Sequence, residues 1–120
     1  MIKPISYRDT IPFQEQAIRH NLIFRNDVDY IGYFIHNELV GIAATENKKN
    51  KTILRSAFVC HSYRGQGIYH ELVKYRMIHA KHKTIEMTCT KMSLPYHLKR
   101  GATIIREFKN YTKVKYENIS

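Results

Sequence analysis

The chain has 120 residues, 43% of them hydrophobic, with 20 Lys and Arg against 10 Asp and Glu. This apolar content is typical of a folded chain, and the length can bury one core, so we expect a single domain over residues 1–120. The sequence shows neither a membrane-spanning run nor a secretory signal. Its two cysteines form no paired metal motif, which predicts free thiols in a reducing, cytoplasmic compartment.

The formal net charge of +10 is the most unusual property of the composition. A strongly basic domain attracts polyanions at long range, so nucleic acid, a ribonucleoprotein surface or a phosphate-rich cofactor are candidate partners. The alternative is a solvated basic surface without a macromolecular partner.

The residue pattern predicts strands and helices in alternation. We expect a short strand over residues 2–7, then a helix over residues 12–25 with Asp9 or Thr10 as N-cap and Pro12 in the first turn. Two further helices are expected over residues 68–81 and 93–100, the second capped by Ser93 and ended by Gly101. The other apolar segments are expected to be strands: residues 30–35, 39–45, 51–59, 84–90, 103–108 and 111–116.

Two glycines lie where the expected strand 51–59 turns into the expected helix 68–81. The backbone N–H groups of a first helical turn lack intrahelical partners, and Gly65 and Gly67 let an anion approach them while Arg64 adds a positive charge. This arrangement suits a phosphate group, and a tight turn with a solvated arginine is the alternative. The segment matches neither the three-glycine dinucleotide fingerprint nor a P-loop.

The order valine, three residues, Tyr-Arg-Gly-x-Gly-Ile-Tyr resembles the acyl-CoA loop of the GNAT superfamily of N-acyltransferases. The resemblance implies acetyl-CoA as acyl donor, with its pyrophosphate on the loop amides. Tyr69 replaces a small residue of the family pattern, so we expect its ring to turn away from the cofactor. The implied cofactor-binding residues are Phe58, Val59, Arg64, Gly65, Gln66, Gly67, Ile68, Tyr69 and Ser93.

The element order also resembles that family over nearly the whole chain. It implies an α/β fold class with a GNAT-like central mixed sheet, helices on both faces and a parallel pair of strands, 51–59 and 84–90, that splays to admit pantetheine. The family has two helices between its first two strands, where this chain has room for one. The acceptor site is therefore expected to be open, or to be completed by the second subunit of a homodimer.

A second, more degenerate motif lies at residues 93–102. It resembles the family segment in which a tyrosine protonates the departing thiolate, and it places His97 at that tyrosine and Tyr96 at a neighbouring aromatic position that is usually a packing residue. Both are candidate catalytic residues, since a positioned general acid contributes about 10²–10⁴ in rate. A backbone N–H near Val59 is the candidate for stabilising the carbonyl oxygen. The base is either Glu46, which follows the third strand, or water.

The resulting hypothesis is an N-acetyltransferase that acts on a primary amine of an unidentified acceptor, macromolecular or anionic. The alternatives are a GNAT-like domain that binds CoA or a protein with little catalysis, and a basic nucleic-acid-binding module. His79 and His82 lack a third ligand, so no metal site is expected. Cys60 ends one of the two splayed strands and Cys89 nearly ends the other. Both thiols are therefore expected near the sulfur end of the cofactor, and the alternative is two inert, partly buried side chains.

Overall fold

The computed structural model describes residues 1–20 and 22–117, which form seven strands, three α-helices and one short 3₁₀-helix. None of these helices is long and apolar enough to cross a membrane. The elements in chain order are β1 (Ile2–Ile5), α1 (Tyr7–Ile18), β2 (Asp29–Ile35), β3 (Glu38–Asn47), β4 (Thr52–Val59), η1 (His61–Tyr63), α2 (Ile68–Ile78), β5 (Thr84–Cys89), α3 (Leu94–Lys99), β6 (Thr103–Glu107) and β7 (Thr112–Glu117).

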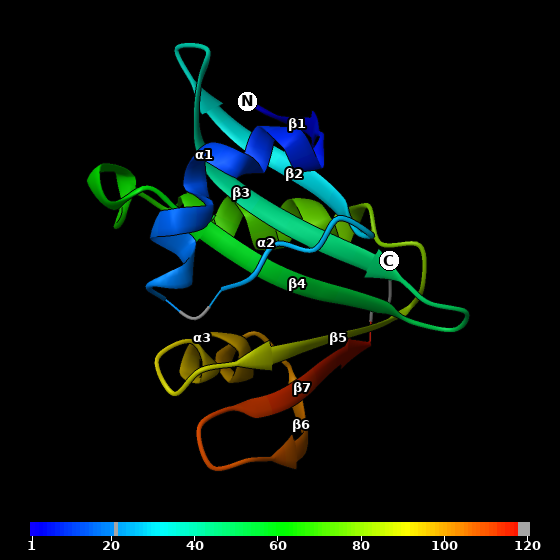
Figure 1. Cartoon of the computed structure of the whole chain (residues 1–120). Coiled ribbons are helices and arrows are strands. Elements are labelled where there is room, and N and C mark those ends of the chain that lie inside the picture. Colours follow the sequence, from blue (N-terminus) through cyan, green and yellow to red (C-terminus); the bar gives the residue numbers. More distant parts are fainter. Residues whose placement is uncertain (21, 118–120) are drawn as a thin grey trace.

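The strands form one mixed sheet in the order β1-β2-β3-β4-β5-β7-β6. All neighbours are antiparallel except β4 and β5, which are parallel and pair only over Thr52–Leu54 and Ile85–Met87. Beyond these residues the two strands diverge toward the end of the sheet at which α3 lies (Figure 1). Helix α1 covers one face of the sheet and α2 the other. The predicted fold class, including the splayed parallel pair, is confirmed.

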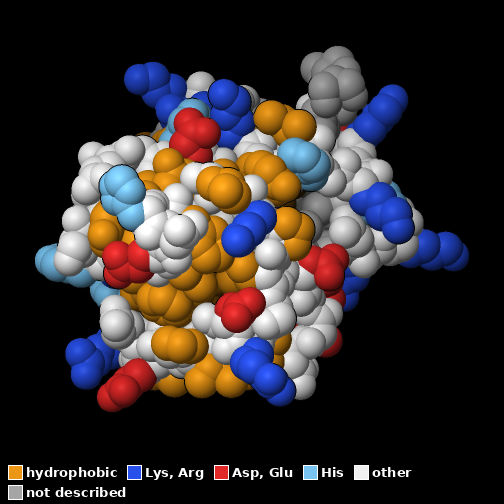
Figure 2. Space-filling view, turned by 90° about the horizontal axis from the view of Figure 1, so that it is seen from above, with side chains coloured by type: hydrophobic (Ala, Val, Ile, Leu, Met, Phe, Trp, Pro, Cys, Tyr) orange, Lys and Arg blue, Asp and Glu red, His pale blue; other side chains and the backbone are white. Residues whose placement is uncertain are grey.

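The core consists of three apolar clusters. One joins α1 to its face of the sheet through Ala17, Ile42 and Phe58, and another joins α2 to the opposite face through Leu72 and neighbours from β3 and β4. The third lies around β5 and β7. Figure 2 shows hydrophobic side chains gathered near the middle of one face, while most Lys and Arg side chains stand apart around its border.

The first helix begins earlier than the sequence predicts. Ser6 is its N-cap, and it forms a capping box in which its side chain accepts from the backbone N–H of Asp9 while the Asp9 carboxylate accepts from the Ser6 N–H. This reciprocal pair satisfies two free donors, so the helix starts at Tyr7, and Pro12 lies inside it. Between β1 and β2 the described residues form this helix alone, as expected.

Candidate active site

The glycine loop has the backbone geometry that its sequence indicates. Gly65 and Gly67 have φ angles of +79° and +83°, in the left-handed region that favours glycine. A Cβ atom at either position would meet nothing within 4 Å, so backbone conformation rather than packing requires the glycines. Gly67 is the N-cap of α2, and no described side chain caps this end. The amides of the first turn are therefore available to an anion.

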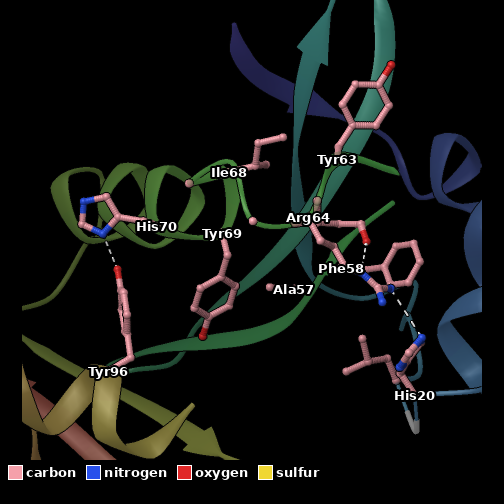
Figure 3. A pocket seen from close by; sticks show the side chains of 13 residues that line it. His20, Ala57, Phe58, Tyr63, Arg64, Ile68, Tyr69, His70 and Tyr96 are labelled. Carbon is pink, nitrogen blue, oxygen red and sulfur yellow. Dashed lines mark hydrogen bonds between the residues drawn. The ribbon is translucent and has the colours of Figure 1, made fainter. Parts of the chain in front are cut away.

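A cavity of about 470 Å³ lies between this loop and the diverging end of β4 (Figure 3). Most of the predicted cofactor-binding residues are in its wall, together with Tyr96 of α3. The complete lining is His20, Leu22, Ala57, Phe58, Val59, Tyr63, Arg64, Gly65, Gly67, Ile68, Tyr69, His70 and Tyr96.

Arg64 is held at the edge of the cavity by three contacts. Its Nε donates to the carbonyl oxygen of Val59 at 2.9 Å, and its guanidinium carbon lies 5.5 Å from the centre of the Phe58 ring. One terminal nitrogen lies 3.4 Å from Nε2 of His20 (Figure 3). The positive charge is thus fixed beside the glycine loop, where it favours an anionic ligand.

Two predicted cofactor residues lie outside the cavity wall. Gln66 is exposed between the two glycines and does not line the cavity. Ser93 is at the N-cap position of α3, as expected, but its side chain makes no capping hydrogen bond. Its hydroxyl instead accepts from the N–H of Thr90 at 3.0 Å and closes a local turn. The Ser93 side chain therefore has a structural contact in this turn.

The ring of Tyr69 lines the cavity, so the expectation that it turns away is wrong. It extends from the first turn of α2 toward the gap between β4 and β5 (Figure 3). Its hydroxyl lies 3.0 Å from Nε2 of His97, and this hydrogen bond holds the ring in place. Burial raises the pKa of the Tyr69 hydroxyl, which keeps it protonated at neutral pH.

His97 lies behind the cavity wall and does not face the cavity. Its side chain is fully buried, and its Nδ1 lies 2.7 Å from the hydroxyl of Tyr116. Burial, reinforced by the charges of Arg76 and Arg100, lowers the pKa of His97 to about 4. His97 is therefore neutral at neutral pH, and its hydrogen bond to Tyr69 connects it to the cavity wall. This corrects the expectation of a direct acid role for His97.

Tyr96 lines the cavity and connects α3 to α2. Its hydroxyl is hydrogen-bonded to Nδ1 of His70 (Figure 3), and the guanidinium of Arg100 lies 3.7 Å from the centre of its ring. The rings of Tyr96 and Tyr69 are edge-on, with centres 5.7 Å apart. Tyr96 therefore packs between α2 and α3 and brings a hydroxyl to the wall.

Sequence reasoning missed five residues of the wall: His20, Leu22, Ala57, Tyr63 and His70. His20 and Leu22 lie in the stretch predicted to be helical, and only the early end of α1 leaves them free to reach the cavity. His70 lies on α2, and the partner that holds it at the cavity wall is Tyr96, 26 residues away. No local sequence signal marks such a long-range contact.

Glu46, the candidate base, lies outside the cavity. Its carboxylate pairs with Arg55 at 2.5 Å, with Arg25 at 3.4 Å and with Lys48 at 3.7 Å. The hydrogen bond from Arg55 is the largest cause of a lowered pKa at Glu46. A carboxylate with a lowered pKa and three cationic neighbours is a poor proton acceptor.

The thiols are also outside the cavity wall. Cys89 is buried in the cluster around β5 and β7, and Cys60 is half-buried and lines a separate groove between α1 and the turn that joins β2 to β3. Among residues 1–20 and 22–117, no three His, Cys, Asp or Glu side chains are grouped so that they could hold a metal ion.

Diverging parallel strands, a glycine loop at a helix N-terminus and a cavity between them lie together in this structure. The model of the Acetyltransferase (GNAT) family matches residues 3–101, and the chain belongs to this family, whose members use acyl-CoA. A search of curated proteins found no match.

Solved structures show the same fold at low sequence identity. A GNAT family acetyltransferase from Elizabethkingia anophelis with acetyl-CoA bound is 16% identical, with a TM-score of 0.73 over 98% of this chain and 97% of that one. The ribosomal-protein-S18-alanine N-acetyltransferase from Escherichia coli is 10% identical, with a TM-score of 0.78 over 98% and 93%. The IAA acetyltransferase from Bacillus cereus ATCC 14579 is 13% identical, with a TM-score of 0.76 over 98% of both chains.

Proposed function

We propose that this protein transfers the acetyl group of acetyl-CoA to a primary amine of an acceptor molecule. The observation that carries the proposal is the cavity of about 470 Å³, which begins at the uncapped, glycine-bearing start of α2 and continues along the end of β4. The family membership supports acyl-CoA as the donor. The solved relative with acetyl-CoA bound supports acetyl-CoA in particular.

The donor fits the residues that line the cavity. The amides around Gly67 and the guanidinium of Arg64 would hold the pyrophosphate, as helix N-termini hold phosphate groups. The pairing of β4 with β5 ends at Leu54, so the edge of β4 from Ala57 to Val59 has no strand partner on that side among the described residues. An extended amide-bearing chain such as pantetheine can pair with this edge.

The amine must lose a proton before it attacks the thioester carbonyl. No carboxylate lines the cavity in the part of the chain that the structure describes, and the imidazole side chains in this lining are those of His20 and His70. We infer that His20, at the mouth beside Arg64, or water takes this proton. The charge of +10 disfavours a polycationic acceptor and favours a neutral or anionic one.

The absence of a carboxylate in the described lining also favours a second candidate, a domain that binds acyl-CoA with little turnover. One experiment separates the two. The protein is incubated with acetyl-CoA and a panel of primary amines, namely short peptides with free amino termini, polyamines and amino sugars. Thiol release is followed spectrophotometrically, and acetylated products are identified by mass spectrometry.

Acetylated product with at least one amine, at a rate well above the uncatalysed rate, would support transfer. Tight acetyl-CoA binding without product would support the second candidate. A third outcome, salt-sensitive binding of nucleic acid that is indifferent to acetyl-CoA, would contradict both.

A further inference from the structure

Three side chains from different elements are hydrogen-bonded in series behind the cavity. The hydroxyl of Tyr69, on α2, lies 3.0 Å from Nε2 of His97, on α3, and Nδ1 of His97 lies 2.7 Å from the hydroxyl of Tyr116, on β7. His97 is 0% exposed and Tyr116 is 5% exposed. Of the three, only Tyr69 lines the cavity, so it is the point at which the series meets a ligand.

The surrounding backbone decides which nitrogen of His97 carries the proton. The carbonyl oxygen of His97 already accepts from the N–H groups of Arg100 at 3.1 Å and Ala102 at 3.0 Å. The Tyr116 hydroxyl can donate to that oxygen at 3.3 Å or to Nδ1 at 2.7 Å. Because the oxygen already accepts two shorter bonds, we assign the hydroxyl proton to Nδ1. A neutral imidazole that accepts at Nδ1 donates at Nε2. The Tyr69 oxygen therefore accepts from His97, and its own proton is free to be donated into the cavity.

Tyr96 is less suited to donate a proton. Its hydroxyl is engaged by Nδ1 of His70, and its ring is held from the other side by Arg100. The partner of the Tyr96 oxygen, His70, is only half-buried, whereas His97 is fully buried, so a hydrogen bond from His70 would stabilise a negative charge on Tyr96 less.

We propose, on the basis of the acetyltransferase function above, that Tyr69 is the catalytic residue that protonates the departing thiolate and that His97 is its positioning residue. The amine nitrogen forms a bond to the carbonyl carbon, and the C–S bond breaks. The thiolate takes the Tyr69 hydroxyl proton, and the phenolate that remains accepts from Nε2–H of His97. The proton that the amine lost returns to the phenolate through water, so the residues end in their starting state.

The test uses the same thiol-release assay with Tyr69→Phe, His97→Leu, His97→Gln and the double variant Tyr69→Phe/His97→Leu. Tyr69→Phe should lower kcat by about 10²-fold or more, the range of a positioned general acid, with acetyl-CoA affinity unchanged. His97→Leu should lower kcat similarly. The Gln side chain places an N–H close to the position of Nε2, so His97→Gln should restore much of the lost rate. Tyr75→Phe is the matched control, because it removes a hydroxyl from the same helix outside the cavity wall.

The double variant separates positioning from packing. If His97 acts through Tyr69, Tyr69→Phe/His97→Leu should be no slower than Tyr69→Phe alone. If the two residues act independently, the fold-decrease in kcat of the double variant should equal the product of the two single decreases. Multiplied losses would overturn the positioning role of His97. An active wild-type protein with an equally active Tyr69→Phe variant would overturn the inference while the proposed function stands. Wild-type protein that releases no thiol with any amine would overturn both. If His97→Leu does not fold by circular dichroism, Tyr69→Phe and His97→Gln decide the outcome.

Discussion

The guanidinium of Arg76 donates from one nitrogen to two backbone carbonyl oxygens, that of Ala44 at 3.0 Å and that of Arg55 at 2.9 Å. The two carbonyls lie where the sheet is irregular, since β3 and β4 shift register after Ala43 and the pairing of β4 with β5 ends at Leu54. Arg76 is only 4% exposed. It therefore satisfies backbone groups at the point where the strands begin to diverge and the cavity opens.

Arg76→Leu should lower the free energy of unfolding by several kcal/mol. Each buried carbonyl left without a donor costs about 1–3 kcal/mol, and the substitution removes the donor of two such carbonyls. Urea denaturation followed by circular dichroism measures the change, and Lys74→Leu on the exposed side of the same helix is the control. Equal midpoints for the two variants would mean that other donors or water replace the guanidinium.

The stability of the protein should fall as the pH is lowered from about 6.5 toward 4. The pKa of His97 is lowered from 6.5 to about 4 in the folded state, so the unfolded chain binds one more proton between these values. The free energy of unfolding should therefore lose up to about 1.4 kcal/mol for each pH unit in this window through His97 alone. The loss should be smaller in His97→Gln, and urea denaturation at a series of pH values measures it in both proteins. If the free energy of unfolding falls equally with pH in wild-type protein and His97→Gln, the buried, neutral state of His97 is contradicted.

The two thiols should be poor targets for alkylation in the native protein. Burial raises the pKa of both Cys60 and Cys89, which leaves little of the reactive thiolate at neutral pH. Iodoacetamide should label half-buried Cys60 slowly and leave Cys89 unlabelled, with or without acetyl-CoA. Mass spectrometry of the labelled peptides measures both sites. Protection of Cys89 by acetyl-CoA would instead place that thiol in the cavity, as the sequence suggested.

Removing the charge of Glu46 should leave kcat unchanged. Glu46 pairs with Arg25, Lys48 and Arg55 outside the cavity wall, so Glu46→Gln should affect only local ion pairing at the surface, a contribution of about 1 kcal/mol or less. The thiol-release assay measures kcat, with thermal unfolding as a second measurement. A large loss of rate with unchanged stability would restore Glu46 as a base candidate.

Local patterns predicted the elements around the site well. The apolar strand, the two glycines and the helical spacing after Ile68 were sufficient to predict the loop, because backbone conformation at Gly65 and Gly67 depends on nearby residues. The diverging strand pair followed from the family resemblance and is confirmed by pairing that stops at Leu54. These features depend on residues that are close in sequence or on the order of the elements.

The rest of the site depends on contacts between distant residues. Nothing in the sequence around Tyr69 shows that His97, 28 residues away, would hold its ring in the cavity. The burial of Arg76 likewise follows from irregular strand pairing, which the spacing of apolar residues along its helix does not reveal. Ser93 was a reasonable helix cap, but its bond to Thr90 competes with that role.

The central claim is that acetyl-CoA binds with its pyrophosphate at the start of α2, and calorimetry on three proteins tests it most directly. Gly67→Asp adds a side chain and a negative charge where the phosphates would lie, while Gly101→Asp places the same residue at another left-handed glycine, with a φ angle of +99°, outside the cavity wall. Wild-type protein and Gly101→Asp should bind acetyl-CoA alike, and Gly67→Asp should lose binding without losing its fold. Equal affinity in Gly67→Asp and wild-type protein, or no binding by wild-type protein, would contradict the claim.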